Sequence, residues 1–266
     1  MEALKYLKTA RFSGADAESF LQAQLSADIA ALKPGDSTFA CYCSPRGQVY
    51  GLLLVCRTER DYLVIGAAEL LPAMLQRLRM FVFRTRVQFE LDEALVIYGV
   101  QHHEPSMKNR LFSPGDFGLH YLVTDSDLKA QEPVPGFRAQ EISAQVVWLD
   151  SATTEKFIPQ MLGFDQLGAV SFTKGCYPGQ EIVARARYLG KVKRKPLVLV
   201  VEQPVSIETA QRIELARGDQ WLKGTIVDAV SEQDSRTYLF VIAPAEPDDP
   251  VSQIRLGQQV YRCATT

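Results

Sequence analysis

The 266-residue chain is poor in the residues that build metal centres and hydrolase triads. It has only three histidines and five scattered cysteines, and it contains neither a Cys-x-x-Cys pair nor a Gly-x-Ser-x-Gly segment. Metal centres made of cysteine and histidine need closely spaced ligands, and α/β-hydrolases place their serine between glycines. Cys41 and Cys43 share one face of an expected strand, and with Cys56 they are interpreted as small apolar residues. The sequence therefore predicts no resident metal and no hydrolase triad.

Long hydrophobic runs and an excess of one charge are also missing. The longest apolar segments, such as Gly51–Cys56, fall far short of the roughly 20 residues that a membrane helix needs. Met1–Lys5 lack the basic and apolar regions of a secretory signal. Scattered cysteines in odd number favour a reducing compartment, and 29 Lys+Arg against 31 Asp+Glu leave a net charge of -2. We expect a cytoplasmic protein without a membrane partner, and the balanced charge argues against a whole surface that binds nucleic acid.

The apolar residues, 47% of the chain, follow an α+β pattern. Ser13 and Asp16 form a capping-box pattern ahead of apolar residues at helical spacing, which predicts a helix that continues to Leu32. A second helix is expected over Ala68–Arg79. Residues 101–136 are rich in turn formers and are expected to form loops around one or two short elements. The expected strands are Thr38–Cys43, Val49–Cys56, Asp61–Ile65, Val87–Leu91 and Leu95–Val100.

The pattern changes after Lys195, where short strand-like runs alternate with turn residues. Regular short strands of this kind are typical of a small barrel, which leaves no open sheet edge. A boundary is therefore expected near residue 195. The expected strands of the barrel are Pro196–Glu202, Arg212–Leu215, Trp221–Val227, Thr237–Ile242 and Gln259–Cys263.

The segment Phe172–Arg187 contains the strongest functional signal. Glycine and proline interrupt residues 174–179 three times, which predicts a tight loop, and a helix is expected over Gln180–Tyr188. Cys176 would lie close to Lys174 and to the amino end of that helix, and both favour the thiolate form. The alternative interpretation is a structural loop with a buried, inert cysteine.

This segment resembles the Lys-Gly-Cys-Tyr-x-Gly-Gln-Glu signature of the YgfZ family. The signature is matched at Lys174, Gly175, Cys176, Tyr177, Gly179, Gln180 and Glu181, and further resemblance lies at 157–160, 167–172, 183–187, 13–16, 20–22, 28 and 43–47. The likeness spans most of the chain and is tight over 157–188. Three positions depart from the family pattern. Members of the family often have Asn at the position of Gly163 and Trp near the position of Phe137. They often have Gly-x-Pro at the positions of Gln145–Val147.

The resemblance implies the fold of the glycine-cleavage aminomethyltransferase, in which three units form a ring around a hole that receives folate. We therefore expect an α+β, aminomethyltransferase-like ring with mixed or antiparallel sheets and a C-terminal small β-barrel. Residues 1–45 and 135–190 would form a discontinuous folate-binding α/β domain. Residues 46–134 would form an inserted α+β domain, and residues 191–266 the barrel domain.

The implied cofactor is tetrahydrofolate or a one-carbon derivative of it. Such a ligand needs an aromatic or apolar slot for its pterin, amide or carboxylate groups for the pterin edge, and basic groups near its anionic tail. The resemblance makes Phe137 the expected slot and Cys176, with Lys174, the expected reactive site. The other expected folate contacts are Asp28, Gln160, Tyr177, Gln180, Glu181 and Arg185. Glu181 has a second interpretation, in which it holds the loop by accepting backbone N–H bonds.

The implied function is that of an accessory factor for iron–sulfur cluster assembly or repair, without an assigned reaction. Its partners would be folate and, transiently, iron–sulfur client or assembly proteins, while nucleic acid is not expected. Two alternatives stay open. One is a folate-dependent aminomethyltransferase, although fold alone does not determine function. The other is a folate-using RNA modification factor, for which a basic run is the only support.

Two clusters of basic residues accompany these sites. One runs from Arg185 to Lys195 without an acidic residue, and it is either a solvated helix end and linker or a contact for the carboxylates of the folate tail. The other, Arg77–Arg86, alternates arginines with Leu78, Phe81 and Phe83. It is interpreted as a half-buried amphipathic edge rather than a site.

Overall fold

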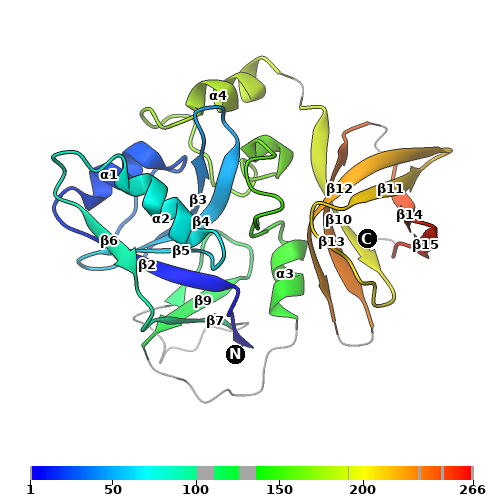
Figure 1. The fold of residues 1–266 in the computed structure, drawn as a ribbon, viewed down its shortest axis with the longest axis horizontal. Helices are drawn as coiled ribbons and strands as arrows, with labels where there is room; N and C mark the ends of the chain where they lie inside the picture. Colours follow the sequence, from blue (N-terminus) through cyan, green and yellow to red (C-terminus); the bar gives the residue numbers. More distant parts are fainter. Residues whose placement is uncertain are drawn as a thin grey trace.

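A computed structural model describes residues 2–100, 111–125, 136–190, 192–232, 235–246 and 249–264 of the chain. Three antiparallel sheets and a few short helices make up these residues. The first two sheets lie together in one body, and the third forms a barrel beside it (Figure 1). The expected α+β class with antiparallel sheets is therefore confirmed.

The first sheet contains five strands in the order β3-β4-β5-β2-β6. Two helices lie near it, α1 (Ala17–Gln24) and α2 (Leu71–Arg79). Every residue of β5, and every residue of β4 except its last, is buried. The sequences of these two strands are nearly continuous apolar runs, because separate clusters of apolar side chains cover their two faces. The strands are β2 (Leu7–Ser13), β3 (Ser37–Cys43), β4 (Val49–Arg57), β5 (Tyr62–Ala67) and β6 (Gln88–Leu91).

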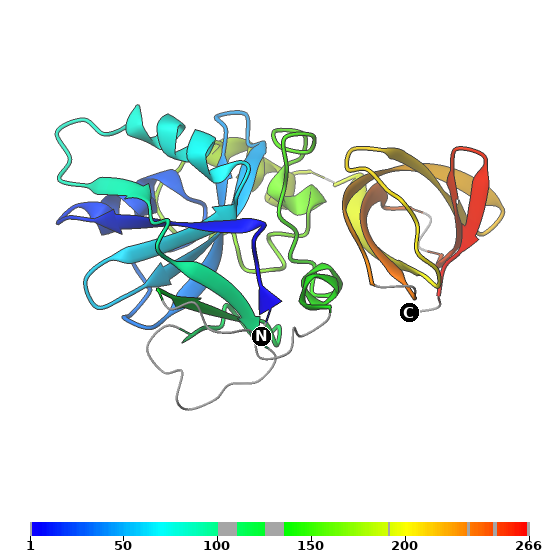
Figure 2. The ribbon, with the colours of Figure 1, turned by 60° about the horizontal axis from the view of Figure 1, so that its bottom comes forward.

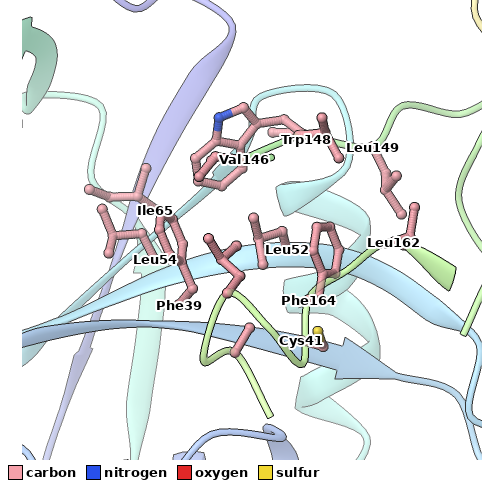
Figure 3. Close-up of a cluster of buried hydrophobic side chains, with 14 of the residues drawn as sticks. Phe39, Cys41, Leu52, Leu54, Ile65, Val146, Trp148, Leu149, Leu162 and Phe164 are labelled. Atoms are coloured by element: carbon pink, nitrogen blue, oxygen red, sulfur yellow. The ribbon is translucent and has the colours of Figure 1, made fainter. Parts of the chain in front are cut away.

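The second sheet has four strands in the order β1-β7-β9-β8. The strands are β1 (Glu2–Ala3), β7 (Val96–Val100), β8 (Leu111–Phe112) and β9 (His120–Thr124). Helix α3 (Phe137–Ser143) follows, and the chain then passes through a short 3-10 helix, η2 (Pro159–Met161), to α4 (Gln180–Tyr188). The main apolar cluster joins one face of the first sheet to these segments, and it contains Phe39, Trp148 and Phe164 (Figure 3).

The third sheet has six strands in the order β10-β13-β12-β11-β14-β15. An isolated bridge between Val201 and Cys263, with a 2.8 Å bond from Ala264 N to Val200 O, joins its two ends. The sheet is thereby closed into the expected small barrel (Figure 2). The strands are β10 (Arg194–Val201), β11 (Arg212–Arg217), β12 (Gln220–Ser231), β13 (Thr237–Pro244), β14 (Val251–Leu256) and β15 (Gln259–Arg262).

The barrel packs against the body through apolar contacts and one ionic bridge. Val227, Phe240 and Ile242 of the barrel belong to the main apolar cluster of the body. Next to them, the guanidinium of Arg138 on α3 binds both Glu141 and Asp228, the latter on β12. None of the helices in the described parts of the chain is long and apolar enough to cross a membrane.

Strand pairing shows where the expected domain limits fall. The limit between residues 45 and 46 lies in the turn that joins β3 to β4, and these strands pair from Ser37–Cys56 to Cys43–Val49. A division there would cut one sheet in two. The limits near 135 and 191 lie at the edges of the described segments. The three-unit division therefore stays a prediction.

Candidate functional site

The loop Ser171–Gly179, which contains Cys176, is anchored to the body by a buried lysine. The ammonium of Lys174 donates to the carbonyl oxygens of Leu25 at 2.7 Å and Ala27 at 2.9 Å, and to that of Gln22. Lys174 is only 9% exposed. Its desolvation lowers the pKa of Lys174 to about 8, against the attraction of Asp28. An ammonium has three N–H groups, and all three are engaged by carbonyls at and after the end of α1.

This arrangement corrects the expected pairing of Lys174 with the thiol. The loop does place the two residues close in sequence, but the ammonium points to the end of α1, where its donors are used. Lys174 therefore positions the loop rather than forming a reactive pair with Cys176. Sequence spacing could not show this, because the three carbonyls lie about 150 residues away along the chain.

Tyr177 is the second anchor of the loop. Its side chain is 7% exposed, and the Lys174 ammonium lies 5.5 Å from the centre of its ring. Burial, followed by the nearby thiols of Cys43 and Cys41, raises the pKa of the Tyr177 hydroxyl. Tyr177 thus packs inward against β3, and it is not free to stack on a ligand.

A glycine pair joins the loop to the turn between β3 and β4. Gly179 precedes α4 with φ +82, and a Cβ there would lie 2.4 Å from Ser44 O and 2.7 Å from Gly47 Cα. Gly47 has φ +73, and a Cβ on it would lie 2.9 Å from Cβ of Ile182. Both backbones therefore need glycine, for conformation and for close approach. This contact explains physically why Ser44–Gly47 and Gly179 both belong to the recognised pattern.

Cys176 remains exposed on the loop that these anchors hold. The structure excludes the alternative of a buried, inert cysteine. Cys176 is not among the residues that line five of the best-formed hollows of the described parts of the chain. A thiol that is open to solvent on a rigid loop is suited to meet a group on another molecule.

The remaining expected folate contacts are scattered. Gln160 is buried and donates to Val183 O at 2.7 Å, so it ties η2 to α4. Gln180 is half-buried, and Glu181 and Arg185 are exposed on α4. Asp28 is half-buried beside a different hollow and accepts a 2.9 Å bond from Gln22. The structure does not bring these residues together around one cavity.

Phe137 was expected to form the aromatic slot, and the structure corrects this. Its ring has no exposed surface and lies 5.5 Å, edge to face, from the ring of Tyr121. A Cβ on Gly99 would lie 2.4 Å from this ring. Phe137 is a core residue on which the second sheet packs closely, and it offers no face to a ligand.

A hollow between the body and the barrel has the aromatic and polar lining that was expected of a pterin site. Its volume is about 540 Å³. We call it the interdomain hollow, and its walls come from both parts of the molecule. Its aromatic and aliphatic lining includes Tyr6, Trp148, Leu149 and Val230, and its polar lining includes Glu69, Arg138, Asp150, Thr209 and Asp228.

A fully buried carboxylate organises one wall of the interdomain hollow. Glu141 accepts hydrogen bonds from Tyr6 at 2.6 Å, Tyr121 at 2.8 Å, Trp148 at 2.9 Å and Arg138 at 2.9 Å. Four donors satisfy a charge that would otherwise be costly to bury. Burial together with Glu141 raises the pKa of Tyr121, which therefore stays a donor. The network fixes the orientation of Tyr6, Trp148 and Arg138.

Asp150 and Asp228 complete the polar wall. Asp150 caps its own turn by accepting from Thr153 at 2.6 Å, and it also accepts from Thr209 of the barrel. Asp228 binds Arg138 and the backbone N–H of Ala229. Sequence reasoning missed this set. The only signal in the sequence was a pair of opposite charges three residues apart, Arg138 and Glu141, in a short helix.

Cys41, Cys43 and Cys56 lie in the main apolar cluster, as their interpretation as small apolar residues requires. Burial raises the pKa of Cys41 and of Cys56 well above the usual value for a thiol. Among the described residues no group of three His, Cys, Asp or Glu side chains could hold a metal ion.

No protein-family model matches the chain. Several curated proteins are similar over nearly its whole length. The tRNA-modifying protein YgfZ of Enterobacter sp. (strain 638) is 29% identical, covering 92% of this chain and 86% of that one. A Haemophilus influenzae protein named only as uncharacterized is 31% identical, covering 91% and 88%. The YgfZ of Escherichia coli O157:H7 is 26% identical, covering 90% and 84%.

Among solved structures, the fold is similar to that of the glycine cleavage system aminomethyltransferase T from Bartonella henselae. The TM-score is 0.71, and the match covers 98% of this chain and 83% of that one, at 15% sequence identity. This likeness confirms the expected aminomethyltransferase-like fold. The similarity to curated YgfZ proteins over about 90% of the chain, together with the signature loop around Cys176, shows that the chain belongs to the YgfZ family.

Proposed function

We propose that the protein is a tetrahydrofolate-binding accessory factor for iron–sulfur cluster assembly or repair, which acts on other proteins through Cys176. The observation that supports this most is the interdomain hollow, because it joins aromatic walls to carboxylates within an aminomethyltransferase-like fold. The exposed thiol on an anchored loop supports the second part of the proposal.

The lining of the interdomain hollow fits the pterin end of the ligand. A reduced pterin has a flat ring system and several N–H donors along one edge. Tyr6 and Trp148 would flank the ring, and Asp150 would accept from its edge, since a carboxylate has lone pairs left after its protein bonds. When bound, the folate supplies one-carbon chemistry. The chain's own residues hold it, orient it and shield it from water.

The charge of this hollow points to how the folate tail lies. One guanidinium, Arg138, faces three carboxylates, Glu69, Asp150 and Asp228. The anionic tail would therefore leave towards solvent rather than bind in the hollow. Arg187 and Lys195 of the basic run line a different hollow of about 360 Å³. Added glutamates on the tail are expected to change the affinity little.

Calorimetric titration with tetrahydrofolate tests the site. Asp150→Asn removes the charge but keeps the shape, and it should raise the Kd about tenfold, or about 1.4 kcal/mol. Glu181→Ala is the matched control on exposed α4 and should bind as the wild type does. Loss of binding in Glu181→Ala with normal binding in Asp150→Asn would instead place the folate at α4, where the sequence predicted it.

The role of Cys176 is tested in a strain that lacks the protein. Cys176→Ala should keep the fold and the folate affinity, because the side chain is exposed, but it should not restore the activity of an iron–sulfur enzyme. Full rescue by this variant would refute the thiol role. An assay with aminomethylated lipoyl carrier protein tests the aminomethyltransferase alternative, which rests on likeness of fold alone.

A second candidate function, RNA modification with folate, is favoured by one observation: curated relatives are named tRNA-modifying proteins. The two candidates make different predictions. If the chain assists an iron–sulfur enzyme that modifies tRNA, the deletion strain lacks the modified nucleoside, and purified protein with folate does not form it on tRNA. If the chain itself modifies tRNA, purified protein and a one-carbon folate form the nucleoside, as mass spectrometry of digested tRNA would show.

A further inference from the structure

The turn after α2 displays apolar side chains to solvent. We call residues Met80–Arg86 the α2 tip. Met80 is 70% exposed, Phe81 47% and Phe83 75%. The sequence interpretation of a half-buried edge holds for buried Leu78 and half-exposed Phe81, but it is wrong for Phe83. Large apolar side chains gathered at such exposure mark a contact surface more often than chance.

Hydrogen bonds hold the backbone of the α2 tip at both of its ends. The N–H groups of Met80, Phe81 and Val82 continue the turn of α2 onto carbonyls at 3.0–3.2 Å. Val82 packs into the apolar cluster beneath the tip. At the far end, the carboxylate of Asp16 accepts the backbone N–H of Arg86 at 2.7 Å. Because the backbone is held at both ends, it loses little conformational freedom on docking.

The α2 tip and the last turn of α2 before it carry positive charge that is largely uncompensated. Arg86 is paired with Asp16 at 3.2 Å. Within the described residues, Arg79 and Arg84 have no acidic partner, and Arg77 lies over the ring of Tyr50 at 4.1 Å. Arg84 covers one face of the Phe83 ring at 5.2 Å. The complementary surface is an apolar pocket with an acidic rim.

These contacts favour a protein over a nucleic acid or a lipid surface. Met80 has no ring on which a base could stack, and the Arg84 guanidinium occupies one face of Phe83. Arg77 and Arg86 are folded back onto Tyr50 and Asp16, so neither extends towards phosphates. The side chains that project from the α2 tip end in apolar groups, and burying them requires a pocket on the partner.

Helix α1 connects the α2 tip to the Cys176 loop. Asp16, immediately before α1, holds Arg86, and the carbonyls at the end of α1 hold Lys174. The eight residues of α1 span roughly 12 Å. A partner seated on the α2 tip would therefore lie within reach of the thiol.

We propose that the α2 tip is the docking site for the client protein of Cys176, and that this client presents an apolar pocket rimmed by acidic residues. The inference rests on the proposed function, since it names the surface that brings the client to the thiol. Arginines on the rim steer the encounter, and Met80, Phe81 and Phe83 provide the buried anchor.

The test measures binding of the full-length protein to the purified apo-form of an iron–sulfur enzyme whose activity falls in the deletion strain. Met80→Ser/Phe83→Ser should raise the Kd at least tenfold, and Arg84→Glu should slow association at low salt. Val260→Ser, which changes a half-exposed apolar residue on the barrel, is the matched control and should bind normally. All three variants should keep the wild-type folate affinity and the reactivity of Cys176.

An unchanged Kd for the double variant overturns the docking site and leaves the proposed function standing. Failure of the wild type to bind the enzyme overturns both docking and the client hypothesis, while folate binding stands separately. Binding of the wild type to phosphatidylglycerol vesicles or to tRNA that the double variant loses, with enzyme binding intact, overturns the protein partner in favour of that surface.

Discussion

Lys174 is held as a cation by three backbone carbonyls in a place that disfavours its charge. Lys174→Met should lower the free energy of unfolding by about 2–3 kcal/mol, because those carbonyls lose charge-assisted bonds. The loop that contains Cys176 should also loosen. Urea unfolding at pH 7, with a circular dichroism signal, measures the loss.

The pH dependence of this loss has a definite sign. The pKa of Lys174 falls from 10.5 to about 8 on folding. Above pH 8 the unfolded state therefore binds the proton more than the folded state does, so the stability of the wild type rises with pH until about 10.5. Lys174→Met lacks this rise, and the difference in stability between the two proteins should change by up to about 1.4 kcal/mol per pH unit, in favour of the wild type. If the difference in stability between the wild type and Lys174→Met stayed constant from pH 7 to 10, the carbonyls would be keeping the ammonium charged in the folded state.

Two of the three positions that depart from the family pattern are explained by backbone conformation. Gln145 has φ +60 where the family often has Gly, and Gly163 has φ +72 where Asn is frequent. Both angles lie in the left-handed region that Gly and Asn tolerate best. Gln145→Gly should relieve strain and raise stability by up to about 1 kcal/mol, reduced by the extra entropy of the unfolded chain. A lower thermal midpoint for this variant would mean that the contacts of the Gln145 side chain outweigh the strain.

Residue roles were predicted from sequence only where local pattern determines them. The tight loop and the glycine at 179 follow from a segment interrupted by glycine and proline, whereas the exposure of Cys176 was left open by the sequence. The partners of Lys174 and the burial of Phe137 depend on segments that are distant in sequence, and they were wrong or missing. Glu141 was missed for the same reason, because its donors come from residues 6, 121, 138 and 148.

Elements were predicted better than residue roles, with errors at their ends. Helix α4 begins and ends where expected, and β3, β4, β6 and β7 agree within one residue. The capping box at Ser13 is wrong: Ser13 ends β2, and the Asp16 carboxylate binds Arg86 rather than capping α1. Helix α1 ends at Gln24, and the apolar spacing beyond it reflects burial of Leu25 and Ile29 in non-helical chain. Strand β14 was missed because two adjacent polar residues, Ser252 and Gln253, interrupt its alternation of apolar and polar residues.

The contact between α4 and the β3–β4 turn can be tested by a matched pair of glycine substitutions. Gly179→Ala places a Cβ at 2.4 Å from Ser44 O at a positive φ, so it should lower the free energy of unfolding by about 1–3 kcal/mol. Gly175→Ala has nothing within 4 Å of the added Cβ and no positive φ, so its effect should stay within about 0.5 kcal/mol. The rate of Cys176 labelling by a maleimide should change only in Gly179→Ala. Equal stability of the two variants would contradict the close approach.

At the scale of the molecule, the barrel was predicted as a unit, but its attachment to the body was not. Regular short strands reveal a closed sheet, whereas attachment depends on Val227, Phe240 and Ile242 facing outward from the barrel onto α3 and the core. The interdomain hollow exists because this contact is incomplete. Its polar wall is therefore also part of what holds the two units together.

Arg138 contributes both to the lining of the hollow and to the attachment of the barrel, since its guanidinium joins buried Glu141 to Asp228 of the barrel. Arg138→Met should lower the free energy of unfolding by about 3–5 kcal/mol, because Glu141 would remain buried without a cation. Urea unfolding measures this loss, and trypsin should cleave faster between α4 and β10.

The double variant Arg138→Met/Glu141→Gln separates charge from packing. The amide oxygen introduced by Glu141→Gln can still accept from Tyr6, Tyr121 or Trp148, while the uncompensated charge is gone. The double variant should therefore be more stable than Arg138→Met alone, although Asp228 keeps the barrel side of the bridge unpaired. If the double variant is no more stable, the attachment of the barrel depends on the Arg138–Asp228 pair rather than on relief of the buried carboxylate. Folate titration of both variants would then show whether the hollow keeps its shape when the bridge is lost.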